Sequence, residues 1–256
     1  MIRIMTSNIW GDYFQNPVEL RCNNIIETVR KYSPDVLGVQ EITPSWHHSE
    51  LFTTLSDEYT VLESRLENYV PLLYKTQKYK LLGCGWELYK ETPDKSKGIT
   101  WAVLQDKESG KEIGVCNTHL WWKQGPEHDP IRVKNAKQLL ALMDYIKAKY
   151  DVLVYGFGDF NCVYDSAAMD FLRENDIVTS FEVAEEYSKV CTIHGDPVLG
   201  EDGAYHGKRT DKDLYASIDH VITYRNESVI KRQVVVEDQI ILDATDHSPV
   251  YVDVEF

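Results

Sequence analysis

The chain has 256 residues, of which 43% are hydrophobic and 11% aromatic, and its 41 Asp and Glu outweigh its 27 Lys and Arg to give a net charge of -14. This apolar share is ample for a buried core, and so high an aromatic content is not typical of a disordered chain. Non-specific binding to nucleic acid depends mainly on Lys and Arg neutralising phosphates, which an acidic chain does poorly. We therefore expect a globular protein for which nucleic acid is a possible but not a favoured partner.

The cysteines and the N-terminal residues bear on the location of the protein. The five cysteines are widely spaced and include no C-x-x-C pair, so we expect reduced, mostly buried thiols rather than a zinc site or a disulfide framework. The first residues resemble a strand and not a signal peptide, and no run approaches the ~20 apolar residues of a membrane span. These features predict a cytoplasmic protein without a transmembrane segment, unless a leader peptide has been removed.

Strand and helix patterns alternate in the N-terminal part of the chain. Residues 2–9 predict a strand. A cap and a helix-start proline at residues 16–17, followed by apolar residues at helical spacing, predict a helix that stops at residues 33–34. Residues 36–40 are a short, continuously apolar run that predicts a buried strand. Beyond them, β-rich runs separated by turn-forming residues predict an antiparallel region; they include residues 70–74, 100–104 and 113–117.

The C-terminal half repeats the strand and helix theme. A second helix is predicted to start at Asp129 and to be followed by a strand at residues 152–155. Residues 194–213 hold four glycines and few apolar residues, which predicts a long loop of a kind that is often functional. No linker or break in composition separates these segments, so we expect one domain over residues 1–256. Strands are further predicted at residues 215–224, 229–236 and 249–256.

Polar clusters stand where predicted apolar strands give way to turns. Side chains from the ends of separate strands can converge at one rim of a sheet, so residues far apart in sequence can form one site. The side chains offered are the carboxylates of Glu41, Asp159, Asp219 and Asp246, the amides of Asn8 and Asn161, and the imidazoles of His119 and His247.

This set of side chains suits the hydrolysis of a phosphate ester. Oxygen-rich ligation favours Mg²⁺ or Mn²⁺ over zinc, and such a cation stabilises charge on attacking and leaving oxygens. A histidine oriented by a carboxylate can move a proton near neutral pH. Taken singly, Glu41 also fits a solvated strand end, His119 a structural histidine, and Asp246 with His247 a polar turn. The complete set is what predicts a metal-dependent phosphoesterase.

The order of these clusters along the chain resembles that of the endonuclease/exonuclease/phosphatase superfamily. Its members include deoxyribonuclease I, abasic-site endonucleases, poly(A) deadenylases, inositol polyphosphate phosphatases and neutral sphingomyelinases. The resemblance covers residues 5–251, and a further segment, Glu91-Thr92-Pro93 followed by Thr100-Trp101-Ala102, is similar to one in bacterial and deadenylase-like members. The six motifs are Ser7-Asn8-Ile9, Val39-Gln40-Glu41, Asn117-Thr118-His119-Leu120, Gly158-Asp159-Phe160-Asn161, Ser217-Ile218-Asp219-His220-Val221 and Asp246-His247-Ser248-Pro249-Val250.

The resemblance implies a metal site and a place for the attacking water. Glu41 would be the principal ligand of Mg²⁺ or Mn²⁺, with Asn8 and Asp246 completing or adjoining the site. Asp159 and Asn161 would position the water and the phosphate.

The resemblance also implies proton-transfer roles and a fold. Asp219 would orient His247, a candidate general base or phosphate-contacting imidazole, and His119 would act as an acid or as a phosphate ligand. The implied fold is α/β (α+β by some schemes), a four-layer sandwich of two facing mixed β-sheets flanked by helices.

Departures from the family pattern bear on the substrate. Trp10 and His119 stand where abasic-site endonucleases carry an acidic residue and a tyrosine, so the chain is more similar to the deoxyribonuclease-like, deadenylase-like and phosphatase-like branches. Residues next to the motifs are candidates for substrate binding, with core packing as the alternative for the tryptophans and a solvated loop as the alternative for the others. These candidates are Trp121, Trp122, His194, His206 and Arg209.

Three functions are therefore considered. The first is hydrolysis of a small or medium phosphate ester, either a monoester or a diester, by a metal-activated water. The second is a nuclease acting on DNA or RNA, because a local basic groove can exist on an acidic protein. The third is a binding protein that retains the fold without the chemistry, which the presence of every motif residue disfavours.

Overall fold

The first β-sheet is organised around the N-terminal strand β1, in the computed structural model that describes residues 1–227 and 229–255. β1 pairs in parallel with β2 and antiparallel with β15, and its residues are almost all buried, as expected for a strand covered on both faces. The predicted strand at residues 249–256 is confirmed up to Glu255, and Phe256 lies outside the described residues. In spatial order the strands are β10 (Glu186–Tyr187), β14 (Val229–Val235), β15 (Val250–Glu255), β1 (Ile2–Asn8), β2 (Val36–Gln40), β4 (Leu72–Lys75) and β3 (Tyr59–Leu62).

The second β-sheet contains the predicted antiparallel region. β5, β6 and β7 form an antiparallel run, whereas β7 and β8 pair in parallel because α4 crosses over between them. β13 then returns antiparallel along β8. In spatial order the strands are β5 (Tyr79–Leu88), β6 (Gly98–Asp106), β7 (Glu112–His119), β8 (Leu153–Asp159), β13 (Asp219–Tyr224) and β9 (Ile177–Thr179).

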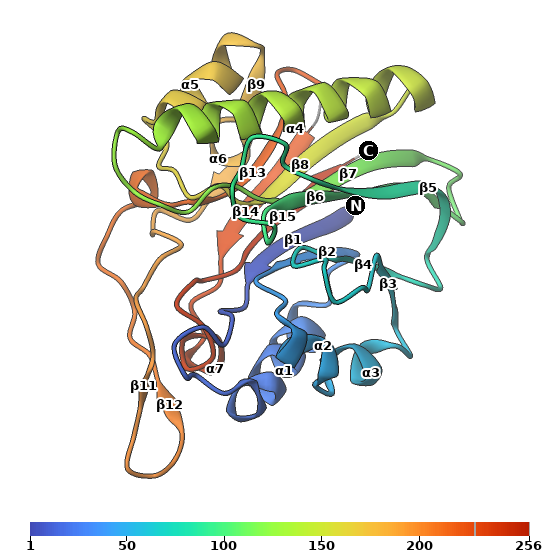
Figure 1. The fold of residues 1–256 in the computed structure, drawn as a ribbon. Coiled ribbons are helices and arrows are strands. Elements are labelled where there is room, and N and C mark those ends of the chain that lie inside the picture. Colours follow the sequence, from blue (N-terminus) through green and yellow to red (C-terminus); the bar gives the residue numbers. More distant parts are fainter. Residues whose placement is uncertain (228, 256) are drawn as a thin grey trace.

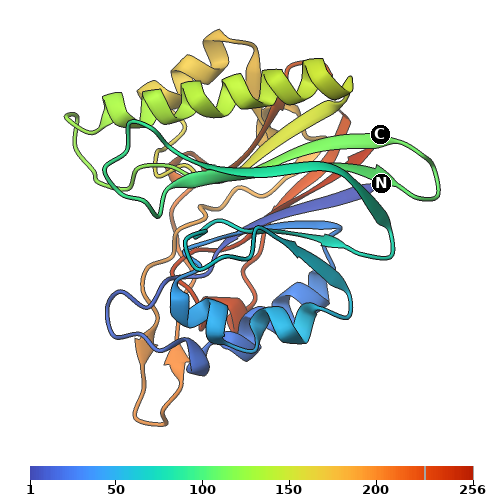
Figure 2. The ribbon, with the colours of Figure 1, turned by 45° about the vertical axis from the view of Figure 1, so that its right-hand side comes forward.

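The two sheets face each other and helices cover both outer sides (Figures 1 and 2). Apolar side chains from both sheets, among them Ile4, Val115 and Phe157, fill the space between them. A second cluster lies under α4 and α5, and a third lies under α1, α2, α3 and α7. This arrangement confirms the predicted four-layer sandwich. The helices are α1 (Cys22–Tyr32), α2 (Pro44–His48), α3 (Leu51–Leu55), α4 (Asp129–Tyr150), α5 (Ala167–Glu174), α6 (Ser180–Val183) and α7 (Gln239–Leu242).

The two long predicted helices are present, with one difference at the first. The segment predicted to be helical after residue 17 begins with a separate 3-10 turn, η1 (Val18–Leu20), and the α-helix starts only at Cys22. The break occurs at Arg21, whose φ of -120° is not helical and whose side chain is fully buried. α4 starts at Asp129 as predicted. None of the helices in residues 1–227 and 229–255 is long and apolar enough to cross a membrane.

The predicted loop at residues 194–213 contains a short hairpin. β11 (Val198–Leu199) and β12 (Tyr205–His206) pair antiparallel and project from the body of the protein (Figure 1). The turn between them includes Gly203 with a φ of 79°, a conformation that glycine adopts readily. Tyr205 anchors the base of the hairpin, because its ring packs edge-on against Trp10 at 5.9 Å. The segment is therefore more ordered than its glycine content predicts.

The cysteines are as expected from their spacing. All five are free thiols; four are buried and Cys84 is exposed. Burial raises the pKa of the Cys22, Cys116, Cys162 and Cys191 thiols, which keeps them protonated and unreactive.

Asp253 links three strands of the first sheet through two arginines. Its carboxylate accepts from Arg3 Nε at 2.7 Å and from Arg232 Nε at 2.5 Å, and the side chain is only 8% exposed. Burial favours the neutral acid, but the hydrogen bonds and charges of Arg3 and Arg232 outweigh it and lower the pKa of Asp253.

We expect Asp253→Asn to lower the free energy of unfolding, because the two arginines lose their anionic partner. The loss should be only about 1 kcal/mol at neutral pH, because solvent screens the half-exposed Arg232. A depressed pKa stabilises the fold above the unfolded pKa of about 4, and this contribution is lost as pH falls through the lower folded value. Urea unfolding at several pH values measures it, with exposed Asp57→Asn as the control. A deficit that does not shrink in acid would contradict this account.

Candidate active site

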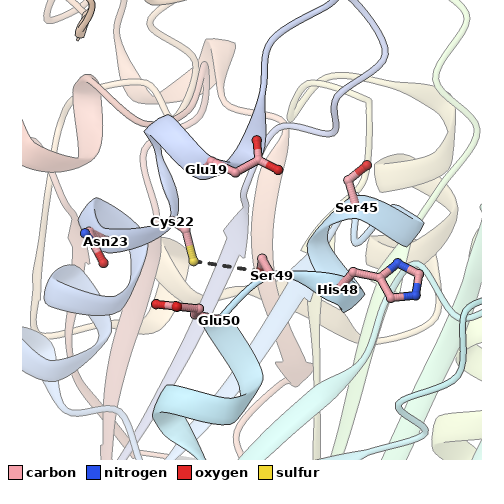
Figure 3. Close-up of a pocket in the computed structure, with 7 residues that line it drawn as sticks. All are labelled: Glu19, Cys22, Asn23, Ser45, His48, Ser49 and Glu50. Atoms are coloured by element: carbon pink, nitrogen blue, oxygen red, sulfur yellow. Dashed lines mark hydrogen bonds between the residues drawn. The ribbon is translucent and has the colours of Figure 1, made fainter.

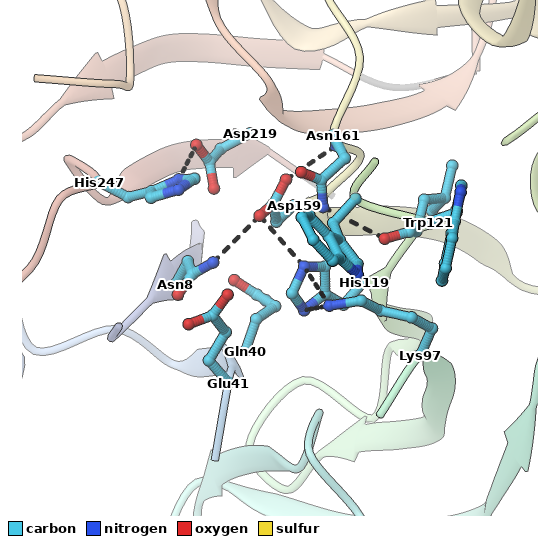
Figure 4. A network of polar contacts seen from close by, with 12 residues as sticks. Asn8, Gln40, Glu41, Lys97, His119, Trp121, Asp159, Asn161, Asp219 and His247 are labelled. Atoms are coloured by element: carbon cyan, nitrogen blue, oxygen red, sulfur yellow. Dashed lines mark hydrogen bonds and ion pairs between the residues drawn. The ribbon is translucent and has the colours of Figure 1, made fainter. Parts of the chain in front are cut away.

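Strand register brings the predicted residues from both sheets to one edge. β1 and β2 are parallel with Asn8 opposite Gln40, so both end at the same level and Glu41 follows directly. In the other sheet His119 lies opposite Asp159, and the first residue of β13, Asp219, also lies opposite Asp159. The side chains therefore converge although they come from distant parts of the sequence (Figure 4).

The turn before β15 supplies the last two predicted residues. Thr245 Oγ1 donates to the carbonyl of Asn8 at 2.8 Å, which holds this turn against the end of β1. Ile193 forms a β-bridge with His247 on the other side. Asp246 and His247 are thereby held beside Asn8.

Unusual backbone conformations occur at the site. Trp10, Glu41 and Asn161 have positive φ values of 58°, 64° and 51°, which non-glycine residues adopt at a cost. Gly158 must be glycine, because a Cβ there would lie 1.9 Å from the carbonyl oxygen of Thr118. Such strain is typical of functional sites, where the surrounding structure holds a side chain in a required direction.

Asp159 is the centre of the polar network. Its Oδ2 accepts from Asn8 Nδ2 at 3.0 Å and lies 3.3 Å from His119 Nε2, while its Oδ1 accepts from the Asn161 N–H at 2.8 Å. Burial favours the neutral acid, but His119, His247 and the Asn161 N–H outweigh it and hold the pKa of Asp159 below its ordinary value. Asp159 is therefore an ionised acceptor.

Asp219 and His247 form a buried pair. His247 Nδ1 lies 2.8 Å from Asp219 Oδ2, and both side chains are at most 8% exposed. Burial disfavours the charged imidazole, yet Asp219 and Asp246 raise the pKa of His247 well above its ordinary value. The imidazole is thereby fixed in orientation, with Nε2 left to face the site. Asp219 Oδ1 has no hydrogen-bond partner among the described residues.

The acidic groups fit a divalent cation. Burial and the neighbouring Glu41 raise the pKa of Asp246 to about 6, because a buried carboxylate beside another is costly to ionise. Glu41 Oε2 accepts from the Gly11 N–H at 2.7 Å. Asn8 turns its amide nitrogen to Asp159, while its oxygen accepts from the Trp10 N–H and keeps a second lone pair for a ligand.

A second grouping could also hold a metal. Ligand atoms of Asp159, Asp219 and His247 lie within 4.8 Å of one another. These three residues are not the predicted metal ligands, which are Glu41, Asn8 and Asp246. His247 uses Nδ1 for Asp219, and Asp159 already accepts two hydrogen bonds and lies 3.3 Å from His119 Nε2. The oxygen-only set therefore has more free lone pairs for Mg²⁺ or Mn²⁺.

A pocket of about 560 Å³ opens beside these residues. Its inner wall includes Glu41, Asp159, Asn161, Asp246 and His247, so five of the predicted residues face one hollow. Aromatic side chains form much of the remaining wall, which makes it suited to an organic group. These aromatic residues are Tyr13, Phe14, Tyr69 and Trp122.

The two predicted tryptophans are placed differently. Trp122 is 49% exposed and lines the pocket. Trp121 is 5% exposed, and its indole Nε1 lies 3.1 Å from His128 Nδ1. The side chain of Trp121 thus packs into the protein behind the site.

The three candidates from the long loop do not line the pocket among the described residues. His206 is exposed on the hairpin, where its Nε2 lies 3.0 Å from Asp202, and Arg209 is exposed beyond it. His194 lies near His247, its ring nitrogens have no partner among the described residues, and burial lowers its pKa to about 4. His194 is the one of the three that borders the predicted residues.

Arg21 is a residue near the site that the sequence patterns do not single out. Its buried guanidinium donates to the carbonyls of Ile9, Trp10 and Ala244 at 2.8 to 2.9 Å, which ties the loop after β1 to the turn that carries Asp246. Burial lowers its pKa to about 10, so it remains charged. An arginine in the first turn of a predicted helix ordinarily faces solvent, and no local signal distinguishes this one.

Lys97 is the second such residue. Its ammonium lies 3.2 Å from His119 Nδ1 and 3.0 Å from Nε2, it lines the pocket, and it is 4% exposed (Figure 4). It stands immediately before β6 in a segment of polar turn-forming residues, where a lysine side chain ordinarily faces solvent. The two stretches that resemble bacterial and deadenylase-like members, Glu91-Thr92-Pro93 and Thr100-Trp101-Ala102, flank Lys97 but do not include it.

A second hollow of about 500 Å³ lies among η1, α1 and α2 (Figure 3). It is lined by Glu19, Cys22, Asn23, Ser45, His48, Ser49 and Glu50, and it contains no residue of the six motifs. The Cys22 thiol lies 3.8 Å from Ser49 Oγ, and burial raises its pKa. The first pocket is therefore the candidate active site.

A two-sheet α/β sandwich with carboxylates, amides and imidazoles gathered at one edge defines a class of hydrolases that act on phosphate esters. The family model described as "Endonuclease/Exonuclease/phosphatase family" matches residues 5–247, and the chain belongs to this family. The resemblance inferred from the motifs is thereby confirmed. Comparison with curated proteins gave no match.

Solved structures share the fold over the whole chain. A mannosyl-6-phosphatase from Bacteroides thetaiotaomicron is 18% identical with a TM-score of 0.79, covering 100% of both chains. The human Nocturnin catalytic domain is 18% identical with a TM-score of 0.73, covering 100% of this chain and 94% of that one. D. rerio TDP2, complexed with single strand DNA product, is 16% identical with a TM-score of 0.73, covering 100% and 99%. At these identities the similarity bears on the fold.

Proposed function

We propose that this protein hydrolyses a phosphate ester with the aid of Mg²⁺ or Mn²⁺. The observation that carries the proposal is the convergence of Glu41, Asp159, Asn161, Asp246 and His247 on one pocket. A bound divalent cation would supply a positive charge that stabilises the phosphate oxygens. Glu41 and Asp246, with Asn8 beside them, are the residues that would hold it.

The remaining residues have separable roles in this proposal. Asp159, ionised and held by two hydrogen bonds and the nearby His119 imidazole, accepts a hydrogen bond from the attacking water and orients it. Asn161 offers its side-chain amide to the phosphate. His247, fixed by Asp219, presents Nε2 to a phosphate oxygen, and its raised pKa favours the donating imidazolium form. His119 lies behind Asp159 and supports its ionised form.

The pocket favours a small or medium substrate. Its aromatic wall can pack against the face of a sugar or another ring, and its volume of about 560 Å³ is that of a small-molecule site. A phosphorylated sugar is consistent with the mannosyl-6-phosphatase that shares the fold. The net charge of -14 disfavours a long nucleic acid.

A panel of phosphate monoesters and diesters, assayed with Mg²⁺ and with Mn²⁺, tests this function. We expect hydrolysis that requires the metal and that is lost when Glu41→Ala and Asp159→Ala are combined. Hydrolysis that persists in this double variant would contradict the proposal, because it would arise from another site or a contaminant.

Nuclease activity is the alternative, favoured by the exposed Trp122 and Phe14 at the pocket rim, since aromatic side chains also stack bases. Single- and double-stranded DNA and RNA at low salt belong in the same panel. Cleavage of these polymers in preference to small esters would replace the first proposal with this one.

A further inference from the structure

Lys97 is a buried cation that the roles above leave unused. Its side chain belongs to the connection between β5 and β6, and the residue that follows it, Gly98, packs tightly against the carbonyl of Glu87. This packing fixes the start of β6 and directs Lys97 inward, toward the buried imidazole of His119. The ammonium thus lies at the inner wall and not at the rim.

Among the described residues, no carboxylate oxygen forms an ion pair within 4.0 Å of the Lys97 ammonium. Burial lowers the pKa of Lys97, and the charges of Glu41, Asp159 and Asp94 only partly oppose this effect. Its polar side-chain contact is the imidazole of His119, whose Nδ1 and Nε2 lie 3.2 and 3.0 Å from the ammonium, while Nε2 also lies 3.3 Å from Asp159 Oδ2. An imidazole has at most one acceptor nitrogen, so at least two of the three ammonium hydrogens have no side-chain partner among the described residues. A buried ammonium in this state is costly unless an anion completes its contacts.

We propose that Lys97 binds a terminal phosphate oxygen of the substrate and thereby selects phosphate monoesters over diesters. This inference rests on the proposed function and concerns the same pocket. A monoester is mostly dianionic above its second pKa of about 6, whereas a diester carries one negative charge and a second organic group in place of a terminal oxygen.

The position of Lys97 makes this difference matter. Lys97 is 4% exposed, so a phosphate oxygen that reaches its ammonium is shielded from water and the charge interaction is strong. The aromatic residues Tyr13 and Trp122 lie on the outer part of the pocket, which leaves an organic group a place away from Lys97. In a diester, the second organic group occupies the place of the terminal oxygen that would bind Lys97. The ammonium would then have no anionic partner.

Para-nitrophenyl phosphate and bis-para-nitrophenyl phosphate compare the two ester classes with the same leaving group. We expect Lys97→Met to lower kcat/KM for the monoester about thirtyfold and for the diester less than about threefold, because a hydrogen bond to a charged group is lost only with the monoester. Methionine keeps an unbranched apolar stem like that of lysine and lacks only the ammonium, so the fold should persist. The control is Lys90→Met, an exposed lysine of the same connection.

Inorganic phosphate gives a readout that does not depend on turnover. Calorimetric titration in the presence of Mg²⁺ should show at least about tenfold weaker phosphate binding in Lys97→Met than in the wild type and Lys90→Met. If the melting temperature of Lys97→Met is well below that of the wild type, Lys97→Gln provides the same test with an uncharged polar side chain. Equal losses on both esters, or unchanged phosphate binding, would overturn the role of Lys97. A wild-type protein that binds phosphate through Lys97 but hydrolyses neither ester would overturn the proposed function alone.

Discussion

Glu41→Gln is expected to reduce hydrolysis at least about a thousandfold, equivalent to about 4 kcal/mol of transition-state stabilisation. The substitution keeps the size of the side chain and the acceptor for the Gly11 N–H, but it removes a charge from the proposed metal site. Binding of Mn²⁺, measured by calorimetry, should weaken in parallel because one anionic ligand is missing. Raising the metal concentration should restore part of the activity if the loss is one of metal affinity.

The control for this variant is Glu108→Gln, an exposed residue in the turn between β6 and β7. It changes the net charge equally and should leave both activity and metal binding unchanged. Normal metal affinity in Glu41→Gln together with normal turnover would remove Glu41 from the site. Loss of turnover with intact metal affinity would instead assign Glu41 to a later step.

Asp219→Asn is expected to lower kcat by roughly 10³-fold with little change in stability. The amide can still fill the space opposite His247 Nδ1, but it neither compensates an imidazolium nor enforces the orientation that leaves Nε2 facing the phosphate. Steady-state kinetics with the metal at saturation measures this effect, and Asp165→Asn, at an exposed position, is the matched substitution.

A double-mutant cycle with His247→Asn separates a pair from two independent residues. If Asp219 acts through His247, the double variant should be nearly as active as the single His247 variant, since groups that act as a unit are not additive. Losses that multiply would show that Asp219 works separately, for instance through its unpartnered Oδ1.

The strands that carry the site were predictable because they are long apolar runs ended by polar residues. β1, β2 and β8 begin or end within a few residues of the predicted limits, and the polar residues at their ends lie where parallel strands place them. α2 and α3 were missed because five residues are too few to show a helical period. The hairpin of β11 and β12 was missed because two-residue strands have no detectable alternation.

Lys97 and Arg21 could not be found for a different reason. A lysine in a polar turn and an arginine near a helix start are ordinary surface residues, and only the packing of other segments buries them here. The loop candidates His206 and Arg209 show the converse, since their residue types suited a site but the hairpin carries them away from the pocket. Local patterns report on strand ends, whereas burial of a charge depends on which segments come to lie over it.

The pairing of β1 with β15 makes the proposed site depend on both ends of the chain. Ile2 lies opposite Val254, and the same two strands frame Asn8 and the turn that carries Asp246. Neither half of the chain contains a complete site, and contacts between such distant residues form slowly because of the loop-closure entropy. We therefore expect the proposed site to be completed only after β15 has been synthesised and has paired with β1.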